Sequence, residues 1–403
     1  MGTRSRRRDP VRGAIALAGV ALFGCGSGSS DAGGAGAGGG SAGTGFLPLD
    51  GGHDTGGVAG TAGTDVGGAS ADGGTAGAGN AAGTGGTGGT GGDIGGTGGI
   101  AGTGIWRPFS DVSPWNTKIP DDPTLAPNSS ALVDHMIQST QWSWLGISVN
   151  GWTVPVYWVD STTTPFVPVT VNRVAGEGFH TDPTAPIPQG ATPDEMGDHH
   201  LCIIDRGLPK AWDCWHAMDG ASGWSCDVAA TADLAGTGVR PMEDGPPPWW
   251  MAHGARACSF PLIAGLITVD EMQAGHIEHA LALGYAGIRS KWYTPPASTS
   301  QAGSGQISPD QGIPCGGRVQ LDPSLDLDAL GLSSSGKTIA RALQEYGAYV
   351  GDYTGSINLY ADDSPEALAV WNAGLLDGNE LRTTIDLHSL RVLEWEPLHD
   401  GKN

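Results

Sequence analysis

The sequence predicts a mainly β fold, a sandwich or jelly-roll-like core with a few helices, which follows a signal peptide and a disordered glycine-rich tether. Short alternating apolar and polar runs, separated by turn residues, fill residues 105–403. All 14 tryptophans lie between Trp106 and Trp395, which marks the globular part. Residues 26–104 consist mainly of Gly, Ala, Thr and Ser, a composition with too few apolar side chains to offset the entropy of folding.

Residues 1–24 have the features of a secretory signal peptide. Five arginines up to residue 12 precede an apolar run over residues 14–23. That run is shorter than the roughly 20 apolar residues of a membrane-spanning helix. The run ends in "LFGC", which resembles the lipobox of bacterial lipoproteins, where cleavage exposes the cysteine and a lipid is attached to it. We therefore expect lipidation at Cys25, and a plain secretory signal is the alternative.

The glycine-rich stretch after Cys25 predicts a flexible spacer. Residues 25–104 would form the lipidated cysteine and a disordered Gly/Ala/Thr-rich linker, and residues 105–403 the β-rich globular domain. A linker of this length would let the domain move some 50 Å from its anchor, by the square-root law for flexible chains. We expect the protein in the bacterial cell envelope, lipid-anchored and either periplasmic or surface-exposed, or else secreted.

The charge of the chain limits its partners. Twenty basic and 42 acidic residues give a formal net charge of -22. Such a surface repels nucleic acid and anionic membranes. We therefore expect a polysaccharide or another glycan as partner, no nucleic acid, and membrane contact only through the N-terminal lipid. Simple colloidal solubility is the alternative explanation of the charge.

Turn signals place several strands. Asn150-Gly151 stands between two alternating runs and predicts a tight hairpin. The runs 200–205 and 211–218 flank a turn at residues 206–210, and a third strand over residues 223–234 follows Asp219-Gly220. These three strands are expected to pair in sequence order.

Capping signals predict three helices. Thr268 and Glu271 form a capping box ahead of residues 269–274. The run "SSSGKTIARALQEYG" begins at a serine cap and stops at Gly347. Pro365 suits the first turn of a helix in "SPEALAVWNAG".

The cysteines fit an oxidising compartment. If Asp205 faces Ala211, Cys202 lies opposite Cys214, and the next turn places Cys226 opposite Cys214 as well. We expect one disulfide among these three cysteines and a second that joins Cys258 to Cys315. With Cys25 lipidated, five cysteines remain, so at least one is unpaired or bonded to another chain.

The hairpin "GDHHLCIIDRGLPKAWDCWHA" is dense in polar side chains. Alternation places His200 with Cys202, and Asp213 with Trp215. A carboxylate beside an imidazole suits acid/base chemistry, because each shifts the pKa of the other. The metal alternative requires further ligands, such as His253 or His279, so no cofactor is assigned and a bound divalent cation stays open.

Two further features add candidates to this hairpin. "AGHIEHALALGY" contains His279, which lies either among apolar residues on a strand or one helical turn from His276. A buried histidine bonded to a carbonyl is the structural alternative. Most of the tryptophans are expected in the core, but Trp249 and Trp250 follow three prolines and are expected at the surface. Exposed tryptophans offer a flat apolar face to sugar rings.

The globular part resembles a family of secreted bacterial β-rich proteins that has no established activity. The resemblance rests on "SPWNTKIPDDPTLAPNSSALV", "GDHHLCIID", "WDCWHA", "PLIAGLITVDEMQAGHIEHAL", "YTPPAS", "GGRVQLDPSLDLDAL" and "IARALQEYGAYVGDYTGS". The polar positions of that pattern fall on Asp198, His200, Asp205, Asp213, His279 and Asp352. Where the family has a histidine after "PA", this chain has Ser298 and Thr299, which implies an altered or inactive member if that histidine is catalytic.

The leading hypothesis from the sequence is a lipid-anchored extracytoplasmic enzyme that cleaves a polysaccharide, either as a glycoside hydrolase or as a polysaccharide lyase. Asp198 or Asp213 would be the carboxylate and His200 or His279 its partner. The expected substrate-binding residues are Trp215, Trp249, Trp250 and Arg256. The alternatives are a non-catalytic glycan-binding module and a surface interaction protein on a flexible stalk.

Overall fold

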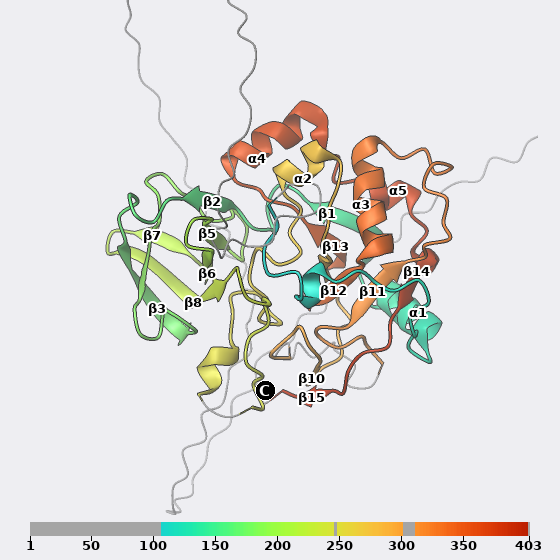
Figure 1. The fold of residues 1–403 in the computed structure, drawn as a ribbon, viewed down its shortest axis with the longest axis horizontal. Helices are drawn as coiled ribbons and strands as arrows, with labels where there is room; N and C mark the ends of the chain where they lie inside the picture. Colours follow the sequence, from blue (N-terminus) through green and yellow to red (C-terminus); the bar gives the residue numbers. More distant parts are fainter. Residues whose placement is uncertain (1–105, 246–247, 301–310, 402–403) are drawn as a thin grey trace, which may run out of the picture. The chain divides into compact units, whose positions relative to one another are not determined.

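The computed structural model describes residues 106–245, 248–300 and 311–401 (Figure 1). This part of the chain is mainly β, with two mixed sheets that form a sandwich-like core and a few helices, as the sequence predicted. The expected signal peptide, the lipidated Cys25 and the tether lie outside the described residues.

The first sheet has six strands from distant parts of the chain. Strands β1 (Trp142–Ser148) and β13 (Ser356–Tyr360) pair in parallel, as do β9 (Leu281–Gly284) and β12 (Ala348–Asp352). The strand order is β1-β13-β9-β12-β11-β14. It is completed by β11 (Arg318–Leu321) and β14 (Leu390–Val392), whose ladders are antiparallel.

The second sheet is built around the predicted polar hairpin. Its path is β2-β5-β6-β8-β3-β4, and β7 pairs with β8 at one side. The strands are β2 (Val156–Val159), β3 (Val167–Ala175), β4 (Thr184–Ala185), β5 (Leu201–Asp205), β6 (Lys210–Trp215), β7 (Met218–Gly220) and β8 (Gly223–Asp233). A separate two-stranded ladder joins β10 (Trp292–Tyr293) to β15 (His399–Asp400).

The three predicted helices are confirmed with their caps. Helix α2 (Val269–Ala274) has the Thr268–Glu271 capping box, α3 (Ser334–Glu345) starts at the Ser333 cap, and α4 (Pro365–Val370) has proline in its first turn. Two more helices are α1 (Ser129–Ser139) and α5 (Glu380–Thr384). Neither has a side-chain cap hydrogen bond, so the sequence signal that marks the other three is missing.

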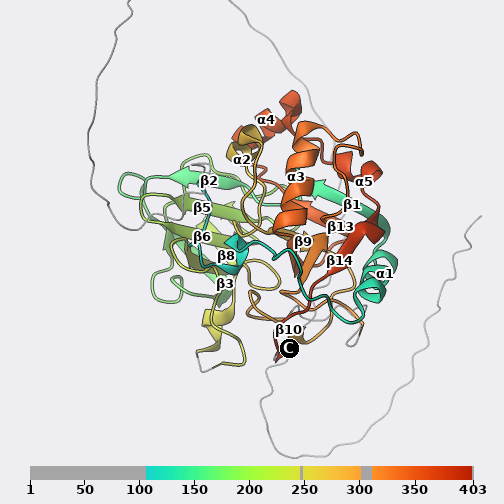
Figure 2. The ribbon, with the colours of Figure 1, turned by 45° about the vertical axis from the view of Figure 1, so that its right-hand side comes forward.

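Two hydrophobic cores hold the sheets. The larger core combines residues of the first sheet with one face of the second, represented by Cys202, Ile204 and Ala211. The opposite face of the second sheet, with Leu201 and Ile203, packs into a smaller core. Both views place the β2–β8 sheet beside the sheet that contains β1 and β13, with α2, α3 and α4 above the latter (Figures 1 and 2).

The predicted hairpin at Asn150-Gly151 is wrong. Gly151 does adopt a positive φ of 81°, as a tight turn requires, but the flanking strands separate. Strand β1 pairs with β13 in the first sheet, whereas β2 pairs with β5 in the second. The segment is therefore a crossover between sheets, because two long-range parallel ladders, β1 with β13 and β2 with β5, outweigh the local turn preference.

The predicted hairpin of β5 and β6 is confirmed, but its register differs by one residue from the one expected. Asp205 pairs with Lys210, so Cys202 lies opposite Asp213 and not opposite Cys214. The Asp205 carboxylate accepts hydrogen bonds from the backbone N–H groups of Gly207 and Leu208, which closes a turn one residue shorter. A slip of one residue changes which side chains share a face, and here it places the Cys202 thiol opposite Asp213, to which it donates a hydrogen bond.

Two disulfides staple the described chain. Cys214 bonds to Cys226, and Cys258 bonds to Cys315, whereas Cys202 is a buried free thiol. Both expectations for the cysteines are confirmed. Structural disulfides persist in oxidising compartments, so the chain matures outside the cytoplasm. Over residues 106–245, 248–300 and 311–401, no helix has the length and apolar character needed to cross a bilayer.

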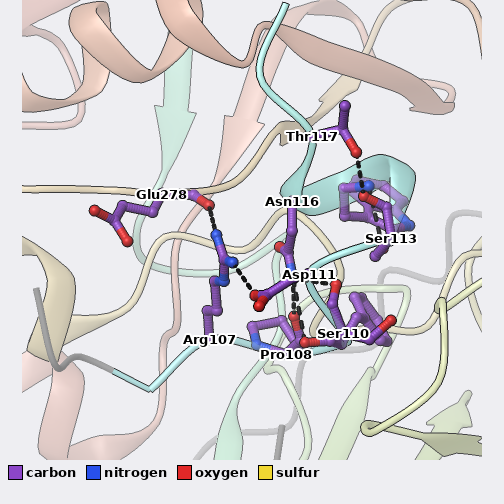
Figure 3. Close-up of polar contacts among 10 residues, drawn as sticks. Arg107, Pro108, Ser110, Asp111, Ser113, Asn116, Thr117 and Glu278 are labelled. Atoms are coloured by element: carbon purple, nitrogen blue, oxygen red, sulfur yellow. Dashed lines mark hydrogen bonds and ion pairs between the residues drawn. The ribbon is translucent and has the colours of Figure 1, made fainter. Parts of the chain in front are cut away.

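The start of the globular part is fixed by a small polar network (Figure 3). The Asn116 side chain donates to the carbonyl groups of Pro108, Phe109 and Ser110. Arg107 donates to the carbonyl of Glu278, which precedes β9. These bonds tie the first loop to the first sheet.

We predict that the Cys258–Cys315 disulfide contributes more stability than Cys214–Cys226. The two bonds span 57 and 12 positions, for which loop-closure entropy gives about 4 and about 3 kcal/mol. Replacement of each pair by alanine should lower the free energy of unfolding in urea in that order. Under reducing conditions the difference between wild type and each variant should disappear, and a persistent difference would contradict the entropic explanation.

Candidate functional site

A cluster of ionisable side chains lies where the two sheets meet. Its members come from elements far apart in the sequence. Strand β12 ends at Asp352, β13 ends at Tyr360, and His200 directly precedes β5. The members influence one another electrostatically, and we call them the Arg256 cluster: Asp198, His200, Arg256, Asp352 and Tyr360.

Arg256 is the centre of this cluster and is only 1% exposed. Its Nη1 lies 3.5 Å from Oδ2 of Asp352, and its Nη2 donates to the carbonyl of Leu262 at 3.3 Å. The guanidinium lies over the ring of Tyr360, 4.5 Å from the centroid. A buried guanidinium requires compensating charge, which explains why carboxylates gather around it.

Glycines make room for these contacts. A Cβ at Gly284, which pairs with Asp352 across β9 and β12, would lie 2.3 Å from the hydroxyl of Tyr360. A Cβ at Gly351 would meet the ring of Phe260 at 2.4 Å and lie close to the stem of Arg256. The missing side chains therefore allow Arg256 and Tyr360 to approach the ends of the central strands.

Asp352 is a carboxyl group whose affinity for protons is increased. Burial raises its pKa, the Arg256 charge lowers it, and the nearby Asp198 raises it again, to a pKa of about 7. The side chain keeps 15% exposure. Asp352 therefore holds a proton over much of the neutral range and still reaches the surface, which a general acid requires.

His200 is buried beneath Asp198. Its Nδ1 is 3.2 Å from the carbonyl of Thr153. Burial lowers its pKa, the Asp198 carboxylate opposes that effect and Arg256 adds to it, which leaves a pKa of about 4. The imidazole is neutral at pH 7, and with 4% exposure it acts on Asp198 from below.

Asp198 lies on a half-exposed loop held by unusual backbone geometry. Its Oδ1 accepts a hydrogen bond from Nε1 of Trp215 at 3.2 Å. The neighbouring His199, His216 and Trp152 have φ values of 42°, 53° and 55°, a region that is uncommon for residues with side chains. Strained residues gather at functional sites when the surrounding structure holds them in place, and these three adjoin the loop that carries Asp198.

Asp213 lies deeper than the Arg256 cluster. It is fully buried, and burial raises its pKa against the lowering effect of Arg240. Its Oδ2 accepts from the backbone N–H of Leu262 at 3.0 Å and lies 3.9 Å from Nη2 of Arg240. The Cys202 thiol also donates to it. Asp213 is therefore a fully buried partner of Arg240 and of the Leu262 backbone.

Asp205 and His279 lie outside the cluster. Burial would raise the pKa of Asp205, but hydrogen bonds from Ser161, Leu208 and Gly207 lower it, so this carboxylate stabilises turns. His279 pairs with buried Glu271 at 2.8 Å through Nε2 and bonds a carbonyl through Nδ1. Both ring nitrogens are thus occupied, which matches the structural alternative for this histidine.

The expected substrate-binding residues are divided between two places. Trp215 contacts Asp198, and Arg256 underlies Asp352. Trp249 and Trp250 belong to a short 3-10 helix (Trp249–Ala252) elsewhere. Trp249 is 49% exposed, and Trp250 stacks on His180, so the surface position predicted for this pair is confirmed for Trp249.

Ser298 and Thr299 stand where the resemblance noted in the sequence implies a histidine. The Ser298 hydroxyl donates to the carbonyl of Ala252 at 2.6 Å, and the Thr299 hydroxyl lies 2.8 Å from that of Ser259. Both side chains are buried. They hold the segment that leads to Arg256, so here this position has a structural role.

The sequence analysis missed a second acidic pair near the cluster. Asp194 and Asp363 are buried and share a hydrogen bond between their side chains. Burial raises the pKa of Asp363, and Asp194 raises it further, to about 8. The pair joins the loop before β5 to the segment after β13, and "ADDSPEA" signalled only the start of a helix.

Nothing in the described residues forms a metal centre: no three His, Cys, Asp or Glu side chains there lie close enough to hold a metal ion. The chain matches no known protein family, no curated protein and no solved structure. The functional argument therefore rests on the site itself.

Asp363→Asn should make the protein less sensitive to alkaline pH. An aspartate in the unfolded chain titrates near pH 3.9, and in the folded chain the pKa of Asp363 is about 8. The stability that protonated Asp363 contributes to the fold is therefore complete below about pH 4 and is lost as the pH rises through 8. The amide cannot ionise, so the variant should be more stable than wild type by about 2 kcal/mol at pH 8.5.

Urea unfolding at pH 5 and pH 8.5 measures this difference. Asp122→Asn, at an exposed aspartate, is the control and should leave the pH dependence of wild type unchanged. Equal losses of stability for wild type and Asp363→Asn between the two pH values would contradict the raised pKa of Asp363.

Glu271→Gln should destabilise the fold by about 3 kcal/mol at pH 6, because it breaks a buried ion pair. Burial lowers the pKa of His279, but Glu271 outweighs burial and raises it. The stability from the charged pair is therefore complete below the unfolded pKa of about 6.5 and is lost as the pH rises through the raised folded pKa. The effect of the substitution should shrink at pH 9.

The neighbouring His276–Glu278 pair provides a matched control. Its separation is 2.9 Å, but both side chains are partly exposed. Glu278→Gln should cost less than about 1 kcal/mol at either pH. A cost equal to that of Glu271→Gln would show that burial does not distinguish the two pairs.

Proposed function

We propose that this chain is an extracytoplasmic glycoside hydrolase that cleaves a polysaccharide, with Asp352 as general acid and Asp198 as the second carboxylate. The observation that carries the proposal is the position of Asp352, a partly exposed carboxyl group 3.5 Å from buried Arg256, whose pKa burial and the Asp198 charge raise. Glycoside hydrolysis requires two carboxyl groups, one protonated and one ionised, on either side of the scissile bond.

Asp352 would protonate the glycosidic oxygen as the C–O bond breaks. Asp198 would either remove a proton from the attacking water, with inversion, or attack the sugar carbon itself, with retention. Trp215 supports this assignment, because its N–H donates to Oδ1 of Asp198. This hydrogen bond orients the Asp198 carboxylate.

The buried members of the cluster would position these two groups. Arg256 lies 3.5 Å from Asp352 and limits how far burial raises its pKa. His200 is neutral and fills the space under Asp198 without adding charge. Asp213 balances Arg256 and Arg240 from below. In this proposal Asp213, Asp205 and His279 support the fold, and the chemistry belongs to Asp198 and Asp352.

Hydrolysis fits the cluster better than elimination. A lyase must neutralise the carboxylate of an acidic sugar. It therefore needs a cationic or proton-donating group that faces the substrate. Arg256 is only 1% exposed, lies 3.5 Å from Asp352 and donates to the carbonyl of Leu262, so it does not face a substrate. The net charge of -22 also repels an anionic polymer. We therefore propose a neutral polysaccharide as substrate.

A non-catalytic glycan-binding module is the second candidate. The observation that favours it is the exposure of several tryptophans, which include Trp142, Trp152 and Trp249. Such a module would need the aromatic faces and not the proton of Asp352. Attachment to the bacterial envelope through a lipid on Cys25 would hold either protein close to the glycans around the cell.

Asp352→Asn should lower kcat on polysaccharide by a factor of about 10² to 10⁴, the usual contribution of a general acid. Because the acid must be protonated, wild-type kcat should fall as the pH rises through about 7, the pKa of Asp352. An aryl glycoside with a good leaving group needs little acid assistance, so its hydrolysis should be affected much less. Release of reducing ends and of phenolate measures the two reactions.

Asp198→Asn should abolish both reactions, and Asp122→Asn at an exposed site should affect neither. Turnover that survives both Asp352→Asn and Asp198→Asn would refute the assignment. Absorbance from unsaturated uronates at the new chain ends would instead identify a lyase, because hydrolysis forms no such double bond. Glycan binding without turnover would identify the binding module.

A further inference from the structure

A pair of stacked tryptophans lies on the edge strand of the first sheet. Trp142 and Trp144 belong to β1, which has a partner strand on one side only. Their ring centroids are 5.8 Å apart and their planes differ by 19°. Trp142 is 45% exposed. Surface-exposed aromatic faces of this size are costly in water and mark interaction sites.

Arg382 extends this aromatic surface. Its guanidinium carbon lies 3.5 Å from the ring centroid of Trp144. A shallow groove of about 230 Å³ is lined by Trp144 and Arg382. Ser143, Asp386 and His388 also line it. The surface thus combines flat apolar rings with hydrogen-bonding groups, a combination that suits the two faces and the hydroxyl rim of a sugar.

The turn after β12 connects this surface to the Arg256 cluster. Asp352 ends β12, exposed Tyr353 follows it, and Gly355 comes two residues later. The backbone N–H of Trp142 donates to the carbonyl of Gly355 at 3.1 Å. A Cβ at Gly355 would lie 3.0 Å from the Trp142 ring, so the ring lies directly against the turn. The three residues 353–355 therefore connect the proposed acid Asp352 to the backbone of Trp142.

We propose that Trp142, whose ring stacks on Trp144, forms a subsite that binds pyranose units of the same polysaccharide chain, remote from the bond that is cleaved. This inference rests on the proposed function for the identity of the ligand. The C–H groups on the face of a pyranose pack against the electron-rich face of an aromatic ring. The subsite makes the protein specific for long chains, because a short substrate cannot reach both Asp352 and Trp142.

The neutral sugar is favoured over an anionic one by the groups around the rings. His388 lies between Asp134 and Asp386, at 3.4 and 3.2 Å, so acidic side chains border the groove. Arg382 already packs on Trp144. The ligand of this subsite is therefore an uncharged pyranose polymer.

Trp142→Ala in the full chain tests the subsite. The probes are soluble neutral β-glucan and xylan, with alginate and polygalacturonate as anionic counterparts, and affinity electrophoresis measures binding independently of turnover. Wild type should bind at least one of the two neutral polymers. Trp142→Ala and Trp144→Ala should each weaken that binding about tenfold, while hydrolysis of an aryl monoglycoside stays unchanged. Trp142→Tyr, which keeps an aromatic face, should restore part of the affinity.

Trp158 provides the matched control. It is 39% exposed on β2 of the other sheet, and the Arg206 guanidinium lies 3.7 Å from its ring centroid, much as Arg382 covers Trp144. Trp158→Ala should leave glycan affinity unchanged. The midpoint of urea unfolding, measured for each variant, separates loss of the subsite from loss of the fold.

The outcomes distinguish this inference from the proposed function. Weaker binding by Trp142→Ala supports the subsite, even if no polysaccharide is hydrolysed and the hydrolase proposal fails. Turnover that requires Asp352, together with unchanged polymer affinity in Trp142→Ala, overturns the subsite and leaves the hydrolase standing. The subsite is also overturned if wild type binds none of the polymers, or if Trp142→Ala only changes the oligomeric state in sedimentation.

Discussion

The buried guanidinium of Arg256 is the constraint on which the centre of this structure depends. It lies at the junction of the two sheets, 1% exposed, where an uncompensated charge would cost several kcal/mol. Asp352 from the first sheet and Asp213 from the second both lower that cost. The charge balance thus links the end of β12 to the middle of β6, and it does so through side chains and not through a shared strand.

The same constraint produces a difference between carboxyl groups. Those that face water or backbone N–H groups, such as Asp205, have a lowered pKa. Those that burial places beside other carboxylates, such as Asp352 and Asp363, have a raised pKa. Burial and hydrogen bonding thus shift the pKa of carboxyl groups in opposite directions in different parts of the fold, and a partly exposed carboxyl group with a raised pKa can act as an acid near neutral pH. The partial exposure of Asp352 distinguishes it from Asp213, which is fully buried and bonded to the backbone of Leu262.

The loops around this region are held more firmly than their irregular shape suggests. His199 and His216 have positive φ values, and the backbone of His216 bonds to the carbonyl of Asp198. The Cys214–Cys226 disulfide ties β6 to β8 directly below. Strain in the loop is thus supported by covalent and hydrogen-bonded neighbours. A rigid loop of this kind can fix the direction of the Asp198 carboxylate.

The sequence by itself determined the β-rich class, the three capped helices, the Cys258–Cys315 disulfide and the polar hairpin that contains Asp198 and His200, because these depend on local patterns and on the chemistry of single side chains. It left open which two of Cys202, Cys214 and Cys226 are bonded. It did not determine the partners of β1 and β2, since Asn150-Gly151 meets the local requirements of a hairpin equally well. Only the tertiary structure decided the register that places Cys202 opposite Asp213, the approach of Arg256 to Asp352, and the electrostatic interaction of Asp198 with Asp352, a residue more than 150 positions away. These features depend on long-range pairing and on the burial of charge, which no local spacing encodes.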